Sequence, residues 1–564
     1  MVSKNSSDSI GEMKMSISIT RRQALAGMSL PLILPAVLGD SAHAETSLGV
    51  FVHGVASGDP QADSVVLWTR VSGFEEPVSV KWQLATDVNF SSIVASGNYV
   101  TGASRDYTVK VVPDGLTPGA RYFYRFEVAG SMSGIGRTRT LPEGAIESLG
   151  LVIVSCSNYP FGYFNAYEAI ALDPDVEFVL HLGDYLYEYG TDGWGGADGE
   201  ALGRQHQPAH ETLTLADYRQ RHAQYKADQQ SQMMHATHPF IAIWDDHETA
   251  NNPWKGGAEN HQNEQEGSWI ERRDASLKAY FEWMPVREPE AGKRQIDYWR
   301  NYRFGDLANL VTLEARHSAR SEQIDYSDYK ELLSDESGGG ASRLMEDIVG
   351  DPERRMLSLE MEDFLEESLT ESKKQGQIWQ LIGNPIPMAR TNAPPLSKEM
   401  LLSLKAELPP ASYAHAAELA RRGELHLPLY LDPWDGYPAA RESFYMRCRK
   451  AGVTDLVVLT GDSHSFWENA LFDEKGRAMG VELGTSGVTS PGDFSQLGEA
   501  GAAEIDRLLA SANEEIIWTN GRKNGYIRLQ LGRDAGRADY ISISNVRTRD
   551  YRVELLRSVP LKPQ

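Results

Sequence analysis

The sequence predicts an α/β domain that follows a small all-β domain, and two patterns support this prediction. Residues 51–141 contain short segments in which apolar and polar residues alternate, separated by turn residues, as expected for a β-sandwich. Beyond Pro142 the pattern changes to near-continuous apolar runs that alternate with helical stretches. Such runs are typical of strands in a sheet that is covered on both faces. They are residues 149–154, 176–180, 240–244 and 455–460.

The length and composition are those of a large globular protein. The 564 residues are 41% hydrophobic and 24% charged, which is enough apolar material for more than one domain. The formal net charge of -24 argues against binding to duplex nucleic acid, because the neutralisation of phosphates requires a basic face. An anionic substrate must therefore be attracted by local charge.

The N-terminus predicts export. Arg21 and Arg22 precede an apolar run at 26–38 and the tripeptide Ala-His-Ala at 42–44, in the order of a twin-arginine signal and its cleavage site. The run is too short to span a membrane, which requires ~20 apolar residues in a helix. We expect residues 1–44 to be removed and the twin-arginine export machinery to be a partner. The mature protein is then periplasmic or secreted.

The all-β domain is predicted over residues 45–145 and the α/β domain over residues 146–564. The segment 115–124 resembles the tyrosine corner of fibronectin type III domains, in which a tyrosine hydroxyl ties a strand to the turn upstream of it. This resemblance implies a fibronectin-III-like sandwich and no chemistry. Three charged helical segments of the α/β domain are expected to form solvated faces or lids. They are residues 217–234, 353–374 and 398–422.

Polar side chains follow four of the apolar runs at the point where each run ends. Because open α/β sheets present their ligand sites at the carboxyl ends of the strands, we expect these side chains to lie close together. A carboxylate that bridges two cations is what the hydrolysis of a phosphate ester needs. The polar residues at these ends include Cys156, Asp184, Tyr187, Asp246, Asp462 and His464.

Four motifs occur in order along the chain. They are Phe-Val-His-Gly-Val-Ala-Ser-Gly-Asp-Pro at 51–60, Leu-His-Leu-Gly-Asp-Tyr-Leu-Tyr-Glu-Tyr at 180–189, Trp-Asp-Asp-His-Glu at 244–248 and Gly-Asp-Ser-His at 461–464. With them the chain resembles the PhoD-type alkaline phosphatases of the metallophosphoesterase superfamily over nearly its whole mature length. The resemblance implies a metallophosphoesterase-type β-sheet sandwich flanked by helices.

The resemblance also implies an iron site. Asp184 would bridge two cations, and Tyr187 would reach the iron as a phenolate, as in purple acid phosphatases. Most of the superfamily has Asp-x-His or a similar pair where this chain has Cys156, and a thiolate favours Fe(III) because it donates charge to iron. A buried structural cysteine is the alternative. The implied iron ligands are Cys156, Asp184, Tyr187 and His464.

The second implied cation has oxygen ligands. Carboxylate and carbonyl oxygens favour calcium over zinc, so we expect one or two Ca²⁺ ions, with other divalent metals as candidates for this site. Asn384 precedes Pro385 and is equally well explained as a turn residue. The implied ligands are Asp184, Asp246, Asp462 and Asn384.

Two further residues are candidates for direct contact with the substrate. His247 would donate a proton to the leaving group or hydrogen-bond a phosphate oxygen, with the orientation of a metal ligand as its alternative role. Arg316 lies in a segment that resembles the arginine segment of PhoD-like proteins, and its guanidinium matches phosphate oxygens. An ion pair at the surface is the alternative for Arg316, and it is our expectation for Arg320.

From these residues we expect hydrolysis of phosphate monoesters, and of some diesters, by in-line attack of a metal-bound hydroxide that releases inorganic phosphate without a covalent phosphoenzyme. The enzymatic alternative is a phosphodiesterase, similar to phospholipase D, that acts on phospholipids or teichoic acids of the cell wall. A binding or adhesion protein would require broken motifs, and all four are intact. The expected partners are small-molecule phosphate esters, with phospholipid or wall polymer as further candidates, and the expected state is a monomer.

Overall fold

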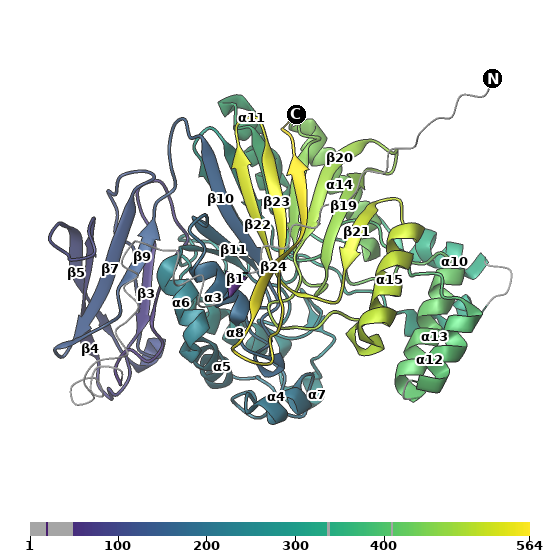
Figure 1. Cartoon of the computed structure of the whole chain (residues 1–564), viewed down its shortest axis with the longest axis horizontal. Coiled ribbons are helices and arrows are strands. Elements are labelled where there is room, and N and C mark those ends of the chain that lie inside the picture. Colours follow the sequence, from purple (N-terminus) through teal and green to yellow (C-terminus); the bar gives the residue numbers. More distant parts are fainter. Residues whose placement is uncertain (1–18, 21–48, 335–338, 408–409, 564) are drawn as a thin grey trace, which may run out of the picture.

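The computed structural model describes residues 19–20, 49–334, 339–407 and 410–563. An all-β region lies on one side of two large sheets, and a group of helices lies on the other side (Figure 1). The predicted signal segment falls outside the described residues, apart from Ile19–Thr20, which form β1. Among the described residues, no helix is both long and apolar enough to cross a membrane.

The N-terminal region is a sandwich of two small layers. One sheet has the strand order β5-β4-β7-β8, with β9 also paired to β7, and the other layer contains β2, β3 and β6. Apolar side chains such as Leu67, Leu84 and Phe126 fill the space between them. The backbone N–H of Thr117 donates to the hydroxyl of Tyr122 over 2.9 Å, which confirms the predicted tyrosine corner. The strands are β2 (Val55–Gly58), β3 (Val66–Arg70), β4 (Val78–Ala85), β5 (Ile93–Thr101), β6 (Thr108–Val111), β7 (Arg121–Val128), β8 (Ser131–Met132) and β9 (Gly136–Arg139).

One layer of this sandwich continues into the first large sheet. Strand β2 lies parallel to β12 and is paired with it at Gly58 and Phe240, which gives the order β1-β24-β23-β22-β10-β11-β12-β2-β3-β6. The sequence patterns do not predict this continuity, since a single residue pair makes the connection. The remaining strands are β10 (Ser148–Val154), β11 (Phe178–Leu182), β12 (Phe240–Ile243), β22 (Asn524–Gly532), β23 (Gly536–Ile543) and β24 (Arg552–Leu561).

The second large sheet has the order β15-β16-β17-β18-β20-β19-β21. Strands β16, β17, β18 and β20 are parallel, as are β10, β11 and β12 in the first sheet. The predicted strands at 149–154, 240–244 and 455–460 agree with β10, β12 and β18 to within two residues. The strands are β15 (Arg300–Phe304), β16 (Ala308–Thr312), β17 (Trp379–Gly383), β18 (Leu456–Thr460), β19 (Phe466–Phe472), β20 (Ala478–Gly484) and β21 (Ile516–Asn520), and a separate hairpin joins β13 (Pro253–Trp254) to β14 (Gly257–Ala258).

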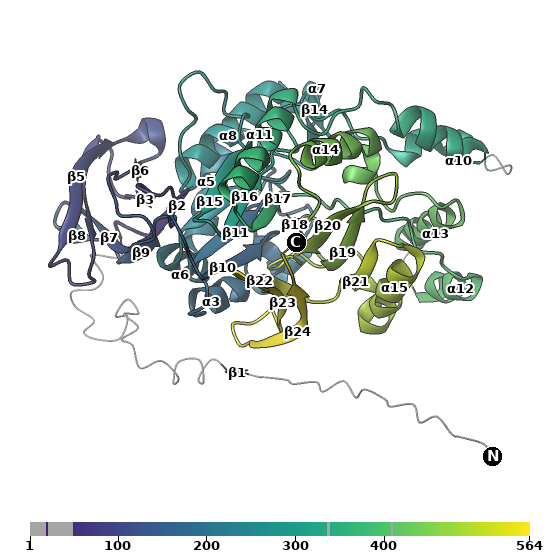
Figure 2. The ribbon, with the colours of Figure 1, turned by 90° about the horizontal axis from the view of Figure 1, so that it is seen from above.

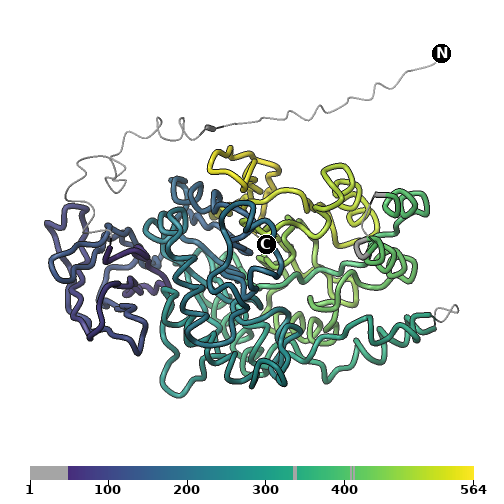
Figure 3. Tube along the Cα trace, turned by 90° about the horizontal axis from the view of Figure 1, so that it is seen from below, coloured from purple at the N-terminus to yellow at the C-terminus, as the bar shows by residue number. Residues whose placement is uncertain are grey.

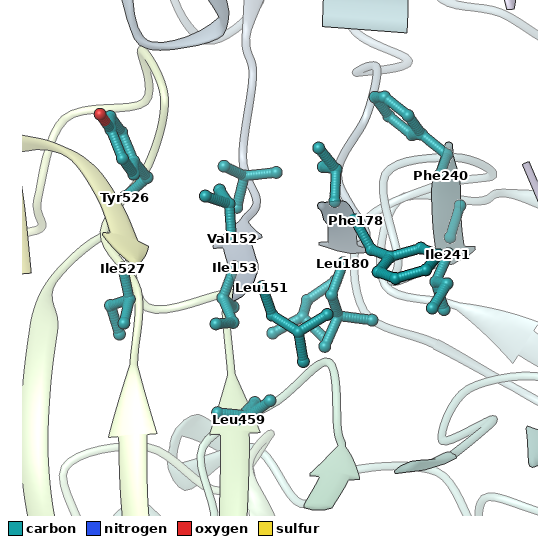
Figure 4. Packing of buried hydrophobic residues seen from close by; sticks show 14 of the residues in the cluster. Leu151, Val152, Ile153, Phe178, Leu180, Phe240, Ile241, Leu459, Tyr526 and Ile527 are labelled. Carbon is teal, nitrogen blue, oxygen red and sulfur yellow. The ribbon is translucent and has the colours of Figure 1, made fainter. Parts of the chain in front are cut away.

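The main core lies between the two large sheets. Leu151 and Ile153 of β10 and Leu180 of β11 belong to the same buried cluster as Leu459 of β18. Figure 4 shows Leu459 pointing from its strand towards Leu151 and Ile153 of the other sheet. Burial of large aliphatic side chains in this way contributes roughly 1.5–3 kcal/mol for each side chain. The predicted two-sheet sandwich is therefore present.

Helices cover the outer faces of the sandwich (Figures 2 and 3). Met361 of α11 and Phe444 of α14 pack with Val458 of β18, while Ile170 of α3 and Met234 of α6 join the main core. The helices are α3 (Asn165–Ala171), α4 (Gly196–Leu202), α5 (Leu215–Ala227), α6 (Gln229–Thr237), α7 (Asn263–Glu266), α8 (Trp269–Trp283), α9 (Lys330–Leu333), α10 (Gly339–Arg343), α11 (Leu359–Gln375), α12 (Lys398–Glu407), α13 (Pro410–Glu424), α14 (Pro438–Lys450) and α15 (Gly498–Ala512).

Helix α5 differs from its prediction. The charged segment 217–234 was expected to be solvated or to form a lid, yet Arg221 and Lys226 of α5 are buried. The Arg221 guanidinium donates to the backbone carbonyls of Tyr187 and Tyr189, in the loop that follows β11. A buried arginine that satisfies backbone acceptors braces that loop, which carries one of the predicted metal ligands.

Candidate metal centre

The predicted ligands other than Asn384 lie at the carboxyl ends of four strands. Cys156, Asp184 and Asp246 follow the neighbouring parallel strands β10, β11 and β12. Asp462 and His464 follow β18 of the second sheet. A backbone bridge between Ser155 and Gly487 joins the two sheets at this edge. The sandwich therefore brings together residues that are about three hundred positions apart in sequence.

The backbone at these strand ends turns sharply. The φ angles of Cys156, Asp184, Asp462 and His464 are 59°, 52°, 63° and 53°, which lie in the left-handed region that residues other than glycine rarely adopt. Such conformations cluster at functional sites because the surrounding structure must hold them in place. Gly183, with φ of 95°, leaves room for the approach of Asp245, since a Cβ atom there would lie 2.3 Å from the Asp245 nitrogen.

The first half of the site combines sulfur, nitrogen and oxygen donors. Ligand atoms of Cys156, Asp184 and His464 all lie within 4.8 Å of one another. The Tyr187 hydroxyl lies 3.0 Å from Oδ2 of Asp184 and 3.3 Å from Nε2 of His464. It also accepts a hydrogen bond from the buried hydroxyl of Ser490 over 2.8 Å. The structure thus brings all four residues of the predicted iron site together.

The second half consists of carboxylates. Oxygen atoms of Asp184, Asp245, Asp246 and Asp462 lie within 4.8 Å of one another, so Asp184 belongs to both halves. Asp245 was not predicted, although it stands next to Asp246 in the Trp-Asp-Asp-His-Glu motif. Where two acidic residues follow a strand, the sequence alone does not show which of them faces the site.

Asn384 holds the turn that was the alternative to its predicted role as a metal ligand. Its amide nitrogen donates to the carbonyl of Ile386 over 2.6 Å, as expected for the turn at Pro385. Its side-chain oxygen accepts a longer bond of 3.4 Å from the indole of Trp434. Because a carboxamide oxygen has two lone pairs, this contact leaves one of them for a ligand. Coordination by Asn384 stays a prediction.

The electrostatics of the site require positive charge. Burial, followed by the neighbouring carboxylates, raises the pKa of Asp184 well above its usual value, and burial raises the pKa of Asp245 to about 6. Burial and the charge of Asp184 likewise raise the pKa values of the Cys156 thiol and the Tyr187 phenol. Oδ2 of Asp245 is buried without a hydrogen-bond partner among the described residues. A bound cation reverses these directions, because it stabilises thiolate, phenolate and carboxylate. The donors present therefore fit metal ions.

Arg316 is buried beside the carboxylates. Its Nε donates to Asp245 over 2.6 Å, and its Nη1 donates to Asp432 over 2.9 Å. Its Nη2 lies 3.6 Å from Asp462 and forms no hydrogen bond within the described chain. The alternative of an ion pair at the surface is therefore wrong for Arg316. Arg320 forms the expected ion pair, with Asp432 at 2.5 Å, but Arg320 itself is buried and Asp432 is only partly exposed.

His247 is held by a residue that the sequence did not single out. Its Nδ1 lies 2.7 Å from Oε2 of the buried Glu188, while its Nε2 lies 3.9 Å from Asp246. The other oxygen of Glu188 accepts the backbone N–H of Asn251 and the side-chain amide of Asn260. Burial would lower the pKa of His247, but the surrounding carboxylates raise it well above its usual value. Glu188 stands next to Tyr187 in a recognised motif, and only the fold shows what it contacts.

Two more residues support the site from outside. The Glu248 carboxylate accepts the backbone N–H groups of Asp184, Tyr185 and Asp245, so it ties the ends of β11 and β12 together. Trp194 stacks on the ring of His464 with centroids 5.3 Å apart. Position in the motif is the only sequence signal for Glu248.

A cavity of about 480 Å³ opens next to the second half of the site. Asp246, His247, Asp462 and His464 are among the residues that line it. Residues of α13, α15 and the segment 429–435 also contribute to its walls. This volume lies in the range of cavities that hold a whole small molecule, so there is space beside the carboxylates for more than a phosphate group.

A two-sheet α/β sandwich whose strand ends gather these donors beside a cavity defines a metallophosphoesterase-type hydrolase. The chain belongs to the PhoD-like phosphatase family. The family description "PhoD-like phosphatase" matches residues 151–540, and "PhoD-like phosphatase, N-terminal domain" matches residues 38–142.

Two relatives extend this assignment. The chain is 33% identical to alkaline phosphatase D of Bacillus subtilis (strain 168) over 537 residues, which cover 92% of this chain and 82% of the relative. A solved structure entitled "Structure of PhoD" superposes with a TM-score of 0.73 at 29% sequence identity and covers 91% of each chain. The fold and the phosphatase class that the sequence predicts are thereby confirmed.

Proposed function

We propose that the protein is an exported phosphatase that hydrolyses phosphate monoesters and some diesters by direct in-line displacement, without a covalent phosphoenzyme. The observation that carries the proposal is the pair of donor clusters that share Asp184. Two cations held in this way generate the nucleophile from water and neutralise the developing charge when they are bound.

The donor types assign a different cation to each half. The thiol of Cys156, the phenol of Tyr187 and the imidazole of His464 suit Fe(III), with Asp184 as the shared carboxylate. The second half suits Ca²⁺, because hard oxygen ligands are what that ion prefers. Its proposed ligands are Asp184, Asp246, Asp462 and Asn384, and Asp245 lies close enough to add a charge to it.

Arg316 and His247 contact the substrate in this proposal. The free Nη2 of Arg316 faces Asp462 and Asp246, so it can donate to a phosphate oxygen bound at the second half. Because Glu188 holds Nδ1 of His247, the imidazole presents Nε2 to the reacting group. Nε2 is then the atom that gives a proton to the leaving group or hydrogen-bonds the phosphate.

A specific observation also supports a diesterase. The cavity beside the carboxylates is larger than a phosphate group requires, so the second ester group of a phospholipid or a wall polymer has room in it. We place monoesters first and diesters second, and the walls from α13 and α15 then determine the ratio between them.

The test uses nitrophenyl phosphate beside its bis ester. We expect the metal-loaded enzyme to hydrolyse both, with activity lost to a chelator and restored by calcium. The variant Arg316→Gln should lose about a hundredfold or more in kcat for both esters. Arg303→Gln, on the exposed side of β15, is the matched control with full activity. Full activity of Arg316→Gln would remove Arg316 from the site.

Export and architecture complete the proposal. Residues 1–44 would direct the chain through the twin-arginine pathway to the periplasm or the medium, and residues 45–145 and 146–564 would be its domains. Replacement of Arg21 and Arg22 by lysine should retain the protein in the cytoplasm, as fractionation would show. We propose a monomer, which sedimentation of the purified protein would test.

A further inference from the structure

Three arginines share one face of two paired strands at the seam between the all-β region and the α/β sandwich. Arg121 of β7 lies directly opposite Arg139 of β9, and Phe123 lies opposite Arg137. Opposite residues of an antiparallel pair point to the same face, with Cβ atoms about 5 Å apart. Like charges in such positions destabilise a sheet, so this arrangement requires a compensating interaction.

Only one carboxylate neutralises this cluster within the described chain. Glu177, just before β11, forms an ion pair with Arg139. Arg137 donates its Nε to the carbonyl of Thr237 over 3.1 Å and forms no ion pair with a described residue. Arg121 is exposed, and its side chain makes neither a hydrogen bond nor an ion pair in the part of the chain that the structure describes. Three guanidinium groups and one carboxylate leave two positive charges on a protein whose net charge is -24.

The arginines line a small groove of about 30 Å³. Glu177, which pairs with Arg139, also lines the groove, and the other walls come from Thr138, Pro174, Val176, Thr237, His238 and Pro239. Residues of the segment before β11 and of the end of α6 therefore face the arginine strands. Strand β9 contacts α6 at this seam, where the two parts of the molecule meet (Figure 1). A water position occupies about 10–15 Å³, so the groove has room for a small oxyanion that displaces two or three waters.

Two acidic residues beside the groove do not neutralise the arginines. Asp173 and Asp175 flank Pro174, but both face Arg528, at 2.9 Å and 3.9 Å. Burial, together with the charge of Arg121, lowers the pKa values of Arg137 and Arg139. Among the described residues, the ion pair with Glu177 is what offsets the three guanidinium groups, and guanidinium groups match the oxygens of a phosphate.

We propose that this groove binds a phosphate group, separately from the metal centre. The ligand is either inorganic phosphate, which the reaction releases, or the phosphate of an anionic headgroup at the cell envelope. Both present the same oxyanion to Arg121 and Arg137, whereas only the headgroup belongs to a surface that would hold the enzyme in place.

The test compares three variants of the metal-loaded enzyme. Arg121→Gln and Arg137→Gln each remove one charge from the groove. Arg125→Gln removes one charge from the same face of β7, where Arg125 donates to Gln83 over 2.9 Å away from the groove, and is the matched control. Because none of these residues belongs to the metal centre, all three variants should hydrolyse nitrophenyl phosphate like the original enzyme.

Inorganic phosphate is the first probe. Calorimetry should detect one phosphate that competes with nitrophenyl phosphate and one that does not. The second should bind about tenfold more weakly, or not at all, to Arg121→Gln and Arg137→Gln, and normally to Arg125→Gln. In buffer without phosphate, Arg121→Gln should melt no lower than the original protein, because the substitution removes a repulsion.

Vesicles are the second probe. One outcome is that calorimetry detects only the phosphate that competes with nitrophenyl phosphate. If the original enzyme and Arg125→Gln nevertheless sediment with phosphatidylglycerol vesicles and not with phosphatidylcholine vesicles, the ligand of the groove is the headgroup. Arg121→Gln and Arg137→Gln should then stay in the supernatant. The proposal is overturned if these two variants equal the control in both assays, or if the original enzyme binds neither probe outside the metal centre.

Discussion

The two halves of the metal centre share Asp184 and differ in almost everything else. Cys156 and Tyr187 are fully buried and lie outside the lining of the cavity, whereas Asp246 and Asp462 form part of it, with 22% of the Asp462 side chain exposed. The sulfur and phenol donors occupy the closed half, from which only His464 reaches the lining of the cavity, and carboxylates occupy the open half. In the proposed function, the closed half would therefore hold one cation permanently, and the open half would hold another where the substrate binds.

Removal of the shared carboxylate should have the largest effect. Asp184→Asn should lower kcat/KM by about a thousandfold or more, which corresponds to about 4 kcal/mol, because both cations lose a ligand. Kinetics and metal analysis of the purified variant measure this. Asp274→Asn on the exposed side of α8 is the control and should behave like the original protein. An Asp184→Asn enzyme with both metals and normal activity would show that Asp184 bridges nothing.

Substitutions confined to one half should separate the two cations. Asp246→Asn should lose calcium, keep iron and lower kcat by roughly a hundredfold. Tyr187→Phe should keep calcium and shift the visible absorption of the iron, with a loss of about tenfold in activity. Element analysis and an absorption spectrum of each variant test this. If either variant loses both metals equally, the halves act as a single unit and the comparison fails.

Metal removal should make stability depend on pH. Burial raises the pKa of Asp245 from its ordinary 3.8 to about 6 and also raises the pKa values of Asp184 and Asp462. Since the folded chain then binds more protons than the unfolded chain, stability without metals is highest below pH 4 for these groups and falls as the pH rises through 6. The chelated protein should lose several degrees of melting temperature between pH 5 and 8. Added calcium and iron should remove that loss, and an unchanged slope with and without metals would contradict the account.

The strands were predictable because their apolar runs are continuous, as burial on both faces demands. The runs at 149–154 and 455–460 mark β10 and β18, and the residues that follow them lie at the site. The candidate ligands were predictable from the same runs, because open α/β sheets present their ligand sites at the carboxyl ends of the strands. Family motifs then supplied the roles of Tyr187 and Cys156, which periodicity alone does not assign.

Contacts between distant segments were not predictable. Glu188, Asp245 and Asp432 are acidic residues like many others in this chain, and only folding shows that they hold His247 and Arg316. Burial of Arg221 was missed because its partners are backbone carbonyls, which leave no signal in the side-chain pattern. The continuity of one layer of the N-terminal sandwich with the first large sheet depends on the single pair of Gly58 and Phe240 and has no sequence signature.

The claim that the two halves of the metal centre hold different cations is tested most directly by the metal content and colour of the purified protein. The account predicts iron and calcium together, with a visible charge-transfer band that Tyr187→Phe shifts and that calcium removal leaves in place. An active enzyme that contains zinc alone and absorbs no visible light would contradict it.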